Sequence, residues 1–331
     1  MTDETVRRRD FITLLGGAAA AWPLAARAQQ PAMPVVGFLR DSPAEGFEHF
    51  VSALRKGLSE AGFVDGQNIA IEFGWSDGHS DRLSALAAGL VRRPVSVIVA
   101  SAIGAALAAK AATSTLPIVF AIANDPVAFG LVSSLTRPGG NTTGVSYLTS
   151  ELGGKRLGLL HELLPSVSFV AVLVNPNNPN ADLFVRDVQA AGATVGVRSH
   201  VVNATSESEI DSAFAAFHQQ RAGALLVAND PVFNRQRLQI VSLAARYALP
   251  AIYTTREFAD AGGLISYGTN LPEVYRWAGI YTGQVLKGAK PADLPIHLPT
   301  AFELVINLKT AKAFSLDVPL TLSALANEVI E

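Results

Sequence analysis

The sequence predicts an α/β fold made of two doubly wound lobes, each a parallel sheet with helices on both faces. Apolar, β-branched runs alternate with helix-length segments along most of the 331 residues, a pattern typical of right-handed βαβ units. A chain of this length can build two domains with separate cores. Residues 111–112 and 116–120 also match residues 244–245 and 249–253 at one constant spacing, which indicates a repeated helix-to-strand unit.

The first series of strands and helices begins at residue 34. Apolar segments that are typical of buried strands occupy residues 35–39, 68–73, 95–100, 117–122 and 144–147. Amphipathic helices are predicted between them at residues 47–61, 82–91 and 105–112. The order predicts one parallel sheet.

A second series follows Pro165. Its strands are predicted at residues 169–174, 194–202, 224–227 and 250–254, and its helices at residues 182–191, 207–219 and 235–247. A helix at 273–286, a Pro-rich bridge at 291–299, a strand at 302–308 and a helix at 310–314 complete the chain.

The segments after residue 267 are too short for a third domain, so we expect them to cross a hinge several times and complete both sheets. Residues 34–147 and 268–297 would then form the N-terminal lobe. Residues 148–267 and 298–331 would form the C-terminal lobe.

Residues 1–28 have the composition of an export signal. Arginines at positions 7–9 precede an apolar stretch at 13–21, and residues 26–28 have the small-x-small form of a cleavage site. The paired arginines before a polar residue and Phe11 resemble a twin-arginine signal. We therefore expect a periplasmic mature protein that begins near Gln29. An ordinary secretory signal or an uncleaved anchor is the alternative.

The composition excludes several classes of function. A net charge near −2 offers no basic surface for nucleic acid. Cysteine is absent, and the six histidines show no metal-binding spacing, so no metal site is expected. No Gly-rich phosphate loop follows the first strand, and no Gly-x-Ser-x-Gly sequence occurs, so we expect neither a cofactor nor an enzyme.

A short polar motif occurs twice, each time directly after a predicted strand. It reads Asn-Asp-Pro-Val at residues 124–127 and again at residues 229–232. Open α/β sheets bind ligands at the carboxyl ends of their strands, so the two copies suggest two sides of one cleft. Because Asn, Asp and Pro also favour turns and helix caps, a purely local role is the alternative. The copies do not fall at the repeat spacing, so we expect them to follow different strands of their lobes.

These strand ends supply the ligand-binding candidates. Strand-end loops and helix N-termini bind anions, and an ammonium group needs an opposing carboxylate, for which Asp230, then Asp125, then Glu257 is the expected order. Tyr253, Phe233, Trp75 or Phe129 would offer a flat partner to an aromatic ligand. For Trp75, packing within its own lobe is the favoured alternative. On this hypothesis, Asp230→Ala weakens binding of an ammonium-bearing ligand and leaves the fold intact. The full set is Asp41, Ser42, Ser101, Ala102, Asn124, Asp125, Asn175, Asn229, Asp230, Phe233, Tyr253 and Glu257.

Several short motifs occur in order along the chain. They are Asp-Pro-Val at 125–127, Arg-Pro-Gly-Gly-Asn at 137–141, Lys-Arg-Leu at 155–157, Val-Asn-Pro at 174–176, Arg-Glu-Phe at 256–258, Gly-Gly-Leu at 262–264, Ser-Tyr-Gly at 266–268 and Phe-Glu-Leu-Val-Ile-Asn-Leu-Lys-Thr-Ala-Lys at 302–312. This ordered set resembles the bacterial family of periplasmic substrate-binding proteins of ABC transporters that includes tryptophan- and other aromatic-amino-acid-binding members.

The resemblance implies a type I periplasmic-binding fold, in which two Rossmann-like lobes close on a ligand that is delivered to permease subunits without catalysis. The chain departs from the family at residues 101–104, where many relatives have Gly-Thr-Pro, and at residues 253–258, where it lacks a common Glu and Trp. The resemblance therefore does not identify the ligand.

We expect a monomeric periplasmic receptor of an ABC importer that binds a small amino-acid-like or aromatic carboxylate. Ligand would stabilise the closed state by its higher affinity for that state. Two alternatives stay open. One is a periplasmic sensing module for a membrane receptor, and the other is a binder of a sugar or nucleoside.

Overall fold

The structure is a computed structural model that describes residues 33–147 and 152–331. The predicted export signal at residues 1–28 lies outside the described residues. Within the described part of the chain, no helix combines the length and apolarity needed to cross a membrane.

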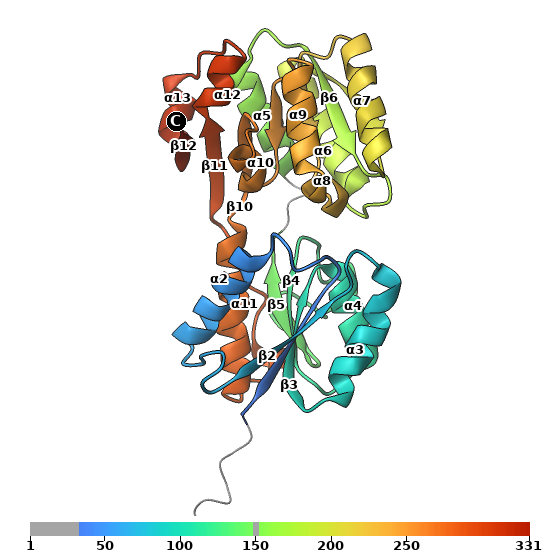
Figure 1. The fold of residues 1–331 in the computed structure, drawn as a ribbon, viewed down its shortest axis with the longest axis vertical. Coiled ribbons are helices and arrows are strands. Elements are labelled where there is room, and N and C mark those ends of the chain that lie inside the picture. Colours follow the sequence, from blue (N-terminus) through green and yellow to red (C-terminus); the bar gives the residue numbers. More distant parts are fainter. Residues whose placement is uncertain (1–32, 148–151) are drawn as a thin grey trace, which may run out of the picture. The chain divides into compact units, whose positions relative to one another are not determined.

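The N-terminal lobe contains a five-stranded parallel sheet (Figure 1). Its order is β2-β1-β3-β4-β5, with β1 at Val35–Arg40, β2 at Ala70–Trp75, β3 at Val95–Ser101, β4 at Ile118–Ile122 and β5 at Thr142–Ser146. The strand predicted from residue 68 begins two residues later. Asn68 belongs to the preceding turn, because its side chain bonds the N–H of Val64 and the carbonyl of Gly62.

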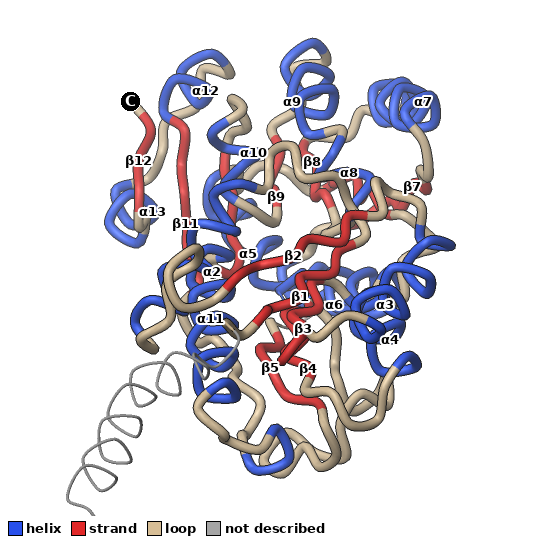
Figure 2. The backbone as a smooth tube through the Cα atoms, turned by 60° about the horizontal axis from the view of Figure 1, so that its bottom comes forward, coloured by secondary structure: helices blue, strands red, loops and turns tan. Residues whose placement is uncertain are grey.

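Helices cover both faces of this sheet (Figure 2). On one face, α2 (Glu48–Glu60) and α11 (Leu271–Leu286) pack on Val36 and Phe38. On the other, α3 (Leu83–Arg92) and α4 (Ile103–Ala112) pack on Leu39, Ile98 and Phe120. Residues of one strand contribute to both clusters because successive side chains point to opposite faces. The backbones of α2 and α11 lie so close at Gly57 and Gly279 that neither position has room for a Cβ atom.

The C-terminal lobe contains a seven-stranded sheet of order β12-β11-β10-β9-β8-β6-β7. Its strands are β6 at Phe169–Val174, β7 at Arg198–Asn203, β8 at Ala224–Val227, β9 at Ala251–Tyr253, β10 at Ile265–Thr269, β11 at Phe302–Asn307 and β12 at Glu328–Ile330. Strands β6 to β10 are parallel and repeat the order of the N-terminal sheet. The repeat predicted from the sequence therefore falls on equivalent elements of the two lobes. Its first copy spans the end of α4 and β4, and its second copy spans the end of α9 (Arg237–Arg246) and β9.

Strand β11 departs from the predicted parallel arrangement, because it pairs antiparallel to β10. The chain leaves the sheet at Thr269, builds α11 on the other lobe and returns at Phe302, which pairs with Thr269. Since it re-enters at the end of the sheet from which it left, the new strand must run back along the old one. Strand β12 is parallel to β11.

Helices also cover both faces of the C-terminal sheet. One face carries α5 (Gly153–Leu163), α6 (Ala181–Val195), α12 (Leu308–Ala313) and α13 (Leu320–Leu325), and the other α7 (Glu207–Gln219), α9 and α10 (Arg256–Asp260). A five-residue helix, α8 (Pro231–Arg235), follows β8. Helix α6 runs to Val195 and ends at Gly196, which has a φ of 75°. The strand predicted from residue 194 therefore starts only at Arg198.

Candidate functional site

Both sheets contain a topological switch point, where the strand order reverses and helices leave toward opposite faces. It lies between β1 and β3 in the N-terminal lobe and between β6 and β8 in the C-terminal lobe. Such crevices at the carboxyl ends of strands are where open α/β sheets bind ligands. We call the two places the N-terminal switch point (Arg40, Ser42, Ser101 and Tyr275) and the C-terminal switch point (Asn175, Asn178, Asn229 and Asp230).

At the N-terminal switch point a hydrogen-bond network joins the ends of β1 and β3. The Arg40 guanidinium donates from Nε to Ser42 Oγ at 2.6 Å, and from Nη1 to Ser101 Oγ at 2.6 Å and Tyr275 Oη at 3.1 Å. Ser101 Oγ and Tyr275 Oη also share a hydrogen bond of 2.6 Å. Predicted site residues Ser42 and Ser101 are therefore brought together by an arginine that the prediction did not include.

Aromatic rings surround this network. The Arg40 guanidinium carbon lies 3.9 Å from the centre of the Phe47 ring, a cation–π contact. Trp75, at the end of β2, packs on Phe38 and Phe47 and stacks on Phe73 at 5.6 Å. Trp75 thus packs within its own lobe, as the sequence predicted. Its ring lies next to Phe47, the ring that contacts Arg40.

Two tyrosines are held neutral beside Arg40. Burial raises the pKa of Tyr275, and the nearby charge of Arg40 partly opposes this rise. Burial also raises the pKa of Tyr147, and the proximity of Tyr275 raises it further. The carboxylate of Asp41 acts on both hydroxyls and also disfavours their ionised form. Asp41 therefore lies within electrostatic range of the switch point.

Ala102 links β3 to α4 with an unusual backbone conformation. Its φ of 83° and ψ of 157° fall in a region that is essentially restricted to glycine. The N–H of Ala102 donates to the carbonyl of Ala121 at 3.0 Å and so holds this conformation. Helix α4 starts at the next residue, and the positive end of its dipole lies at the strand end beside Ser101.

The C-terminal switch point is built on a buried carboxylate. Asp230 is 3% exposed and caps α8, its Oδ1 accepting from the N–H of Val232 at 2.8 Å. The same carboxylate accepts from Asn175 Nδ2 at 3.1 Å and from Asn178 Nδ2 at 2.9 Å. Asn178 also donates to the backbone carbonyl of Asn229. Predicted residues Asn175, Asn229 and Asp230 thus form one cluster with Asn178.

A shallow surface pocket adjoins this cluster. Asn175, Asn178 and Asn229 line it together with Ala181 and Phe184 of α6. The pocket therefore opens beside amide groups rather than beside a free charge.

The first Asn-Asp-Pro-Val copy lies away from both switch points, after β4. Asp125 is exposed, and its Oδ1 accepts from the N–H of Val127 at 2.8 Å and from that of Ala128 at 3.3 Å. The carbonyl of the buried Asn124 accepts from Ser146 Oγ at 2.9 Å. As predicted, the two copies follow different strands, since β4 is next to the edge of its sheet and β8 is central.

Tyr253 and Phe233 do not offer a ring to a ligand, which corrects that prediction. Both are almost fully buried in the core between the C-terminal sheet and α7, α9 and α10. Tyr253 stacks on Phe258 with ring centres 4.7 Å apart. The apolar pattern alone does not separate a core ring from a cleft ring, because both can occur at or just after the end of a strand.

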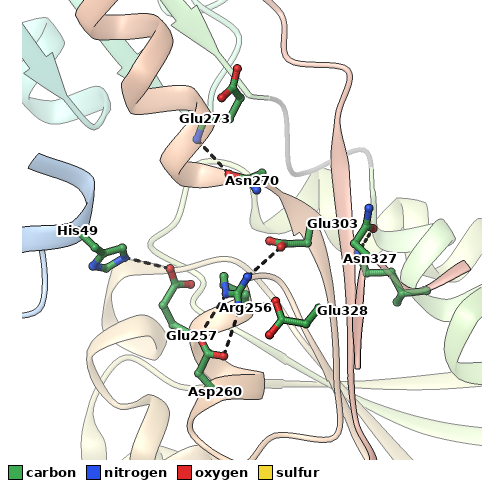
Figure 3. Close-up of polar contacts among 10 residues, drawn as sticks. His49, Arg256, Glu257, Asp260, Asn270, Glu273, Glu303, Asn327 and Glu328 are labelled. Atoms are coloured by element: carbon green, nitrogen blue, oxygen red, sulfur yellow. Dashed lines mark hydrogen bonds and ion pairs between the residues drawn. The ribbon is translucent and has the colours of Figure 1, made fainter. Parts of the chain in front are cut away.

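Glu257 approaches the N-terminal lobe. Its Oε1 lies 3.4 Å from Nε2 of His49 on α2 (Figure 3). Arg256, its neighbour on α10, turns instead to Asp260, Glu303 and Glu328. Glu257 is therefore free of that arginine network and is one point at which side chains of the two lobes meet.

Arg40, Tyr147, Tyr275 and Asn178 are the residues that the sequence prediction missed. Arg40 had a recognisable signal, because it is a charged residue at the last position of an otherwise apolar strand. Tyr275 comes from α11, 174 residues after Ser101, and had no such signal. Among the described residues, no group of three or more His, Cys, Asp or Glu side chains is arranged to hold a metal ion.

Known proteins resemble the chain in sequence and in fold. Residues 43–330 match the family described as ABC transporter substrate binding protein. A tyrosine-binding protein of Clostridioides difficile is 27% identical over 79% of this chain and 75% of its own length.

Solved structures are similar as well. An ABC domain from Streptococcus pneumonia in complex with L-Trp has 27% identity and a TM-score of 0.82, over 90% of this chain and all of that one. A ligand-free, open substrate-binding protein with adhesive properties from Clostridium difficile has 23% identity and a TM-score of 0.70, over 90% of this chain and 99% of that one. The second likeness shows the fold alone.

Proposed function

The chain belongs to the ABC transporter substrate-binding protein family, and from that premise we propose that it is a periplasmic solute receptor of an ABC importer. The proposed ligand is a small amino-acid-like or aromatic carboxylate, bound between two closing lobes and delivered to permease subunits. Two relatives support this ligand class, since one is named for tyrosine and the other is a complex with L-Trp.

The observation that carries the proposal is the composition of the N-terminal switch point. The hydroxyls of Ser101 and Tyr275 and the charge of Arg40 lie beside the ring of Phe47, which is 5% exposed and packs on the partly buried ring of Trp75. A ligand with a charged head and a flat apolar body needs these two surfaces side by side.

Closure would follow from a ligand that contacts both lobes. Such a ligand stabilises the closed state by its differential affinity for it. Side chains of the two lobes already meet at His49 and Glu257. We further propose a monomer that is exported by the twin-arginine-like signal, that acts on no nucleic acid and that catalyses no reaction.

A thermal-shift screen of the chain from Gln29 onward tests the proposal, with L-tyrosine, L-tryptophan, branched amino acids, aromatic acids, sugars and nucleosides. The protein is first unfolded and refolded to remove any retained ligand. A ligand at 100 times its dissociation constant adds about 2.7 kcal/mol to the free energy of unfolding. We expect this stabilisation with an amino acid or aromatic acid.

A shift confined to sugars or nucleosides would keep the receptor and contradict the ligand. No shift with any compound would favour a sensing or partner-binding role. Stimulation of ATP hydrolysis by the reconstituted importer, on addition of the loaded protein, separates transport from sensing.

A further inference from the structure

We propose that Arg40 is the anchor for the carboxylate group of the solute, so that the protein selects free acids over the corresponding amides and esters. This inference rests on the proposed function, because it assumes a solute at the switch point. It adds the residue and the chemical group by which the solute is recognised.

Arg40 has the right position for this role. It is the last residue of β1, and its Nη1 reaches the last residue of β3, Ser101, at 2.6 Å. The guanidinium therefore spans the crevice that the reversal of strand order creates. Helix α4 begins two residues after Ser101 and adds the positive end of its dipole to the same place.

The hydrogen bonds of Arg40 leave one side of its fork available. A guanidinium carries five N–H groups, one on Nε and two on each Nη. Ser42, Ser101 and Tyr275 account for the three on Nε and Nη1. Among the described residues, the two N–H groups of Nη2 have no hydrogen-bond partner.

Arg40 also forms no direct ion pair. In the described parts of the chain, Arg55, Arg93, Arg256 and Arg276 each have a carboxylate within 4.0 Å, and Arg40 has none. The Asp41 carboxylate acts on the same site from a longer distance. A half-buried guanidinium without a directly paired carboxylate attracts an anion, and a carboxylate matches its planar fork.

The fork is held in one orientation before any ligand arrives. Phe47 covers one face of the guanidinium at 3.9 Å, and hydroxyl oxygens fix its Nε and Nη1 edges. Little side-chain entropy is then lost when a carboxylate binds, which favours affinity. A lysine ammonium at this position would keep the charge but lose both the fork and the stacking.

The C-terminal switch point is unsuited to the same group. Its centre is the carboxylate of Asp230, which accepts three hydrogen bonds from Val232, Asn175 and Asn178. A second carboxylate there would meet a like charge. The acid group of the solute is therefore assigned to the N-terminal lobe.

The test measures binding of matched ligand pairs by calorimetry. L-Tyrosine, L-tryptophan and an aromatic acid are each compared with their primary amide and methyl ester. The wild-type protein should bind the preferred free acid on the order of 10- to 100-fold more tightly than its amide, as expected for a charge-assisted hydrogen bond.

Arg40→Met should abolish this preference, so that acid and amide bind with equal affinity. Arg40→Lys keeps the charge without the fork and should lose most of it, which provides a second variant if Arg40→Met does not fold. Arg55→Met is the matched control, because Arg55 belongs to α2 of the same lobe and pairs with Asp65 on the surface. It should preserve the preference.

The outcomes separate the anchor from the proposed function. If acids bind but the preference survives both Arg40 variants, the anchor is wrong and the receptor for acids stands. If the wild-type protein binds amides or sugars as tightly as acids, the anchor and the ligand class are both wrong. If no member of the panel binds, the proposed function fails together with the anchor.

Discussion

The two switch points lie at the same place in the strand order of their sheets. They differ in the sign of the charged side chain and in the groups that hydrogen-bond to it. At the N-terminal switch point a cation, Arg40, is held by hydroxyls and an aromatic ring and forms no ion pair among the described residues. At the C-terminal switch point an anion, Asp230, is surrounded by amide and backbone donors. Equivalent strand ends in two similar lobes can thus hold opposite charges with different kinds of partner.

The two Asn-Asp-Pro-Val copies sharpen this comparison. In both, the aspartate accepts from the N–H of the valine two residues later at 2.8 Å. The local geometry is therefore the same, as expected for an Asp before Pro. Only Asp230 gains two asparagine amides and becomes buried, since only β8 lies beside the switch point.

The largest expected effect comes from breaking the buried cluster. Asp230→Ala leaves the amides of Asn175 and Asn178 and the first turn of α8 without their acceptor, so we expect a loss of about 2–4 kcal/mol in the free energy of unfolding. Asp125→Ala removes only an exposed turn bond and should cost about 0.5–1 kcal/mol. Urea unfolding of both variants measures the difference.

This prediction replaces the expectation that Asp230→Ala leaves the fold intact. Equal losses in the two variants would mean that the buried amides contribute nothing. A normal stability of Asp230→Ala together with weaker binding of amines would restore Asp230 to the ligand site.

A smaller effect of opposite sign is expected at Ala102. Its φ of 83° is strained for any residue with a Cβ atom, whereas residues 228–230 at the corresponding strand end have no positive φ. Ala102→Gly should raise the free energy of unfolding by about 1 kcal/mol, since relief of strain exceeds the added entropy of the unfolded chain. A loss of stability on urea unfolding would show that the backbone is relaxed there.

The smallest effect concerns a carboxylate with a charged partner. A hydrogen bond from Arg276 lowers the pKa of Glu273, a partly exposed residue in the first turn of α11. An acid with a lowered folded-state pKa stabilises the protein above its unfolded-state pKa, and this contribution is lost as the pH falls through the folded-state value.

Glu273→Gln should therefore reduce the free energy of unfolding at pH 7 by less than about 0.5 kcal/mol, because solvent screens the pair. The difference from wild type should shrink as the pH falls below the unfolded-state pKa of about 4.3 and vanish below the lowered folded-state value. Thermal unfolding from pH 3 to 8 checks it, and a difference that grows on acidification would contradict the assignment.

Much of the fold was predictable from local pattern. The strands of the N-terminal sheet and the helices between them follow the predicted segments, because buried parallel strands are continuous apolar runs. Short elements were not predicted, among them α10, α13 and β12. Three to six residues carry too little periodicity to distinguish a helix or strand from a loop. The reversal of β11 depends on where the chain re-enters the sheet, which no local pattern records.

The candidate site was predicted in part. Strand-end reasoning found Ser42, Ser101, Asn175 and Asp230, since a polar residue after an apolar run is visible in the sequence. The same reasoning also selected Tyr253 and Phe233, which are buried in the core of the C-terminal lobe. A ring at or just after the end of a strand has the same sequence pattern whether it faces a cleft or the interior.

The alternation of strands and helices, the division into two similar series and the local Asp hydrogen bond of both Asn-Asp-Pro-Val copies follow from the sequence alone. Each depends on residues that are near in the chain, where hydrophobic period and turn chemistry act directly. Only the tertiary structure decided that Arg40 meets Ser101 and Tyr275, and that Asn175 and Asn178 meet Asp230. Those contacts join residues 52 to 235 positions apart, and the order of the strands with the packing of α11 brings each set to its own switch point.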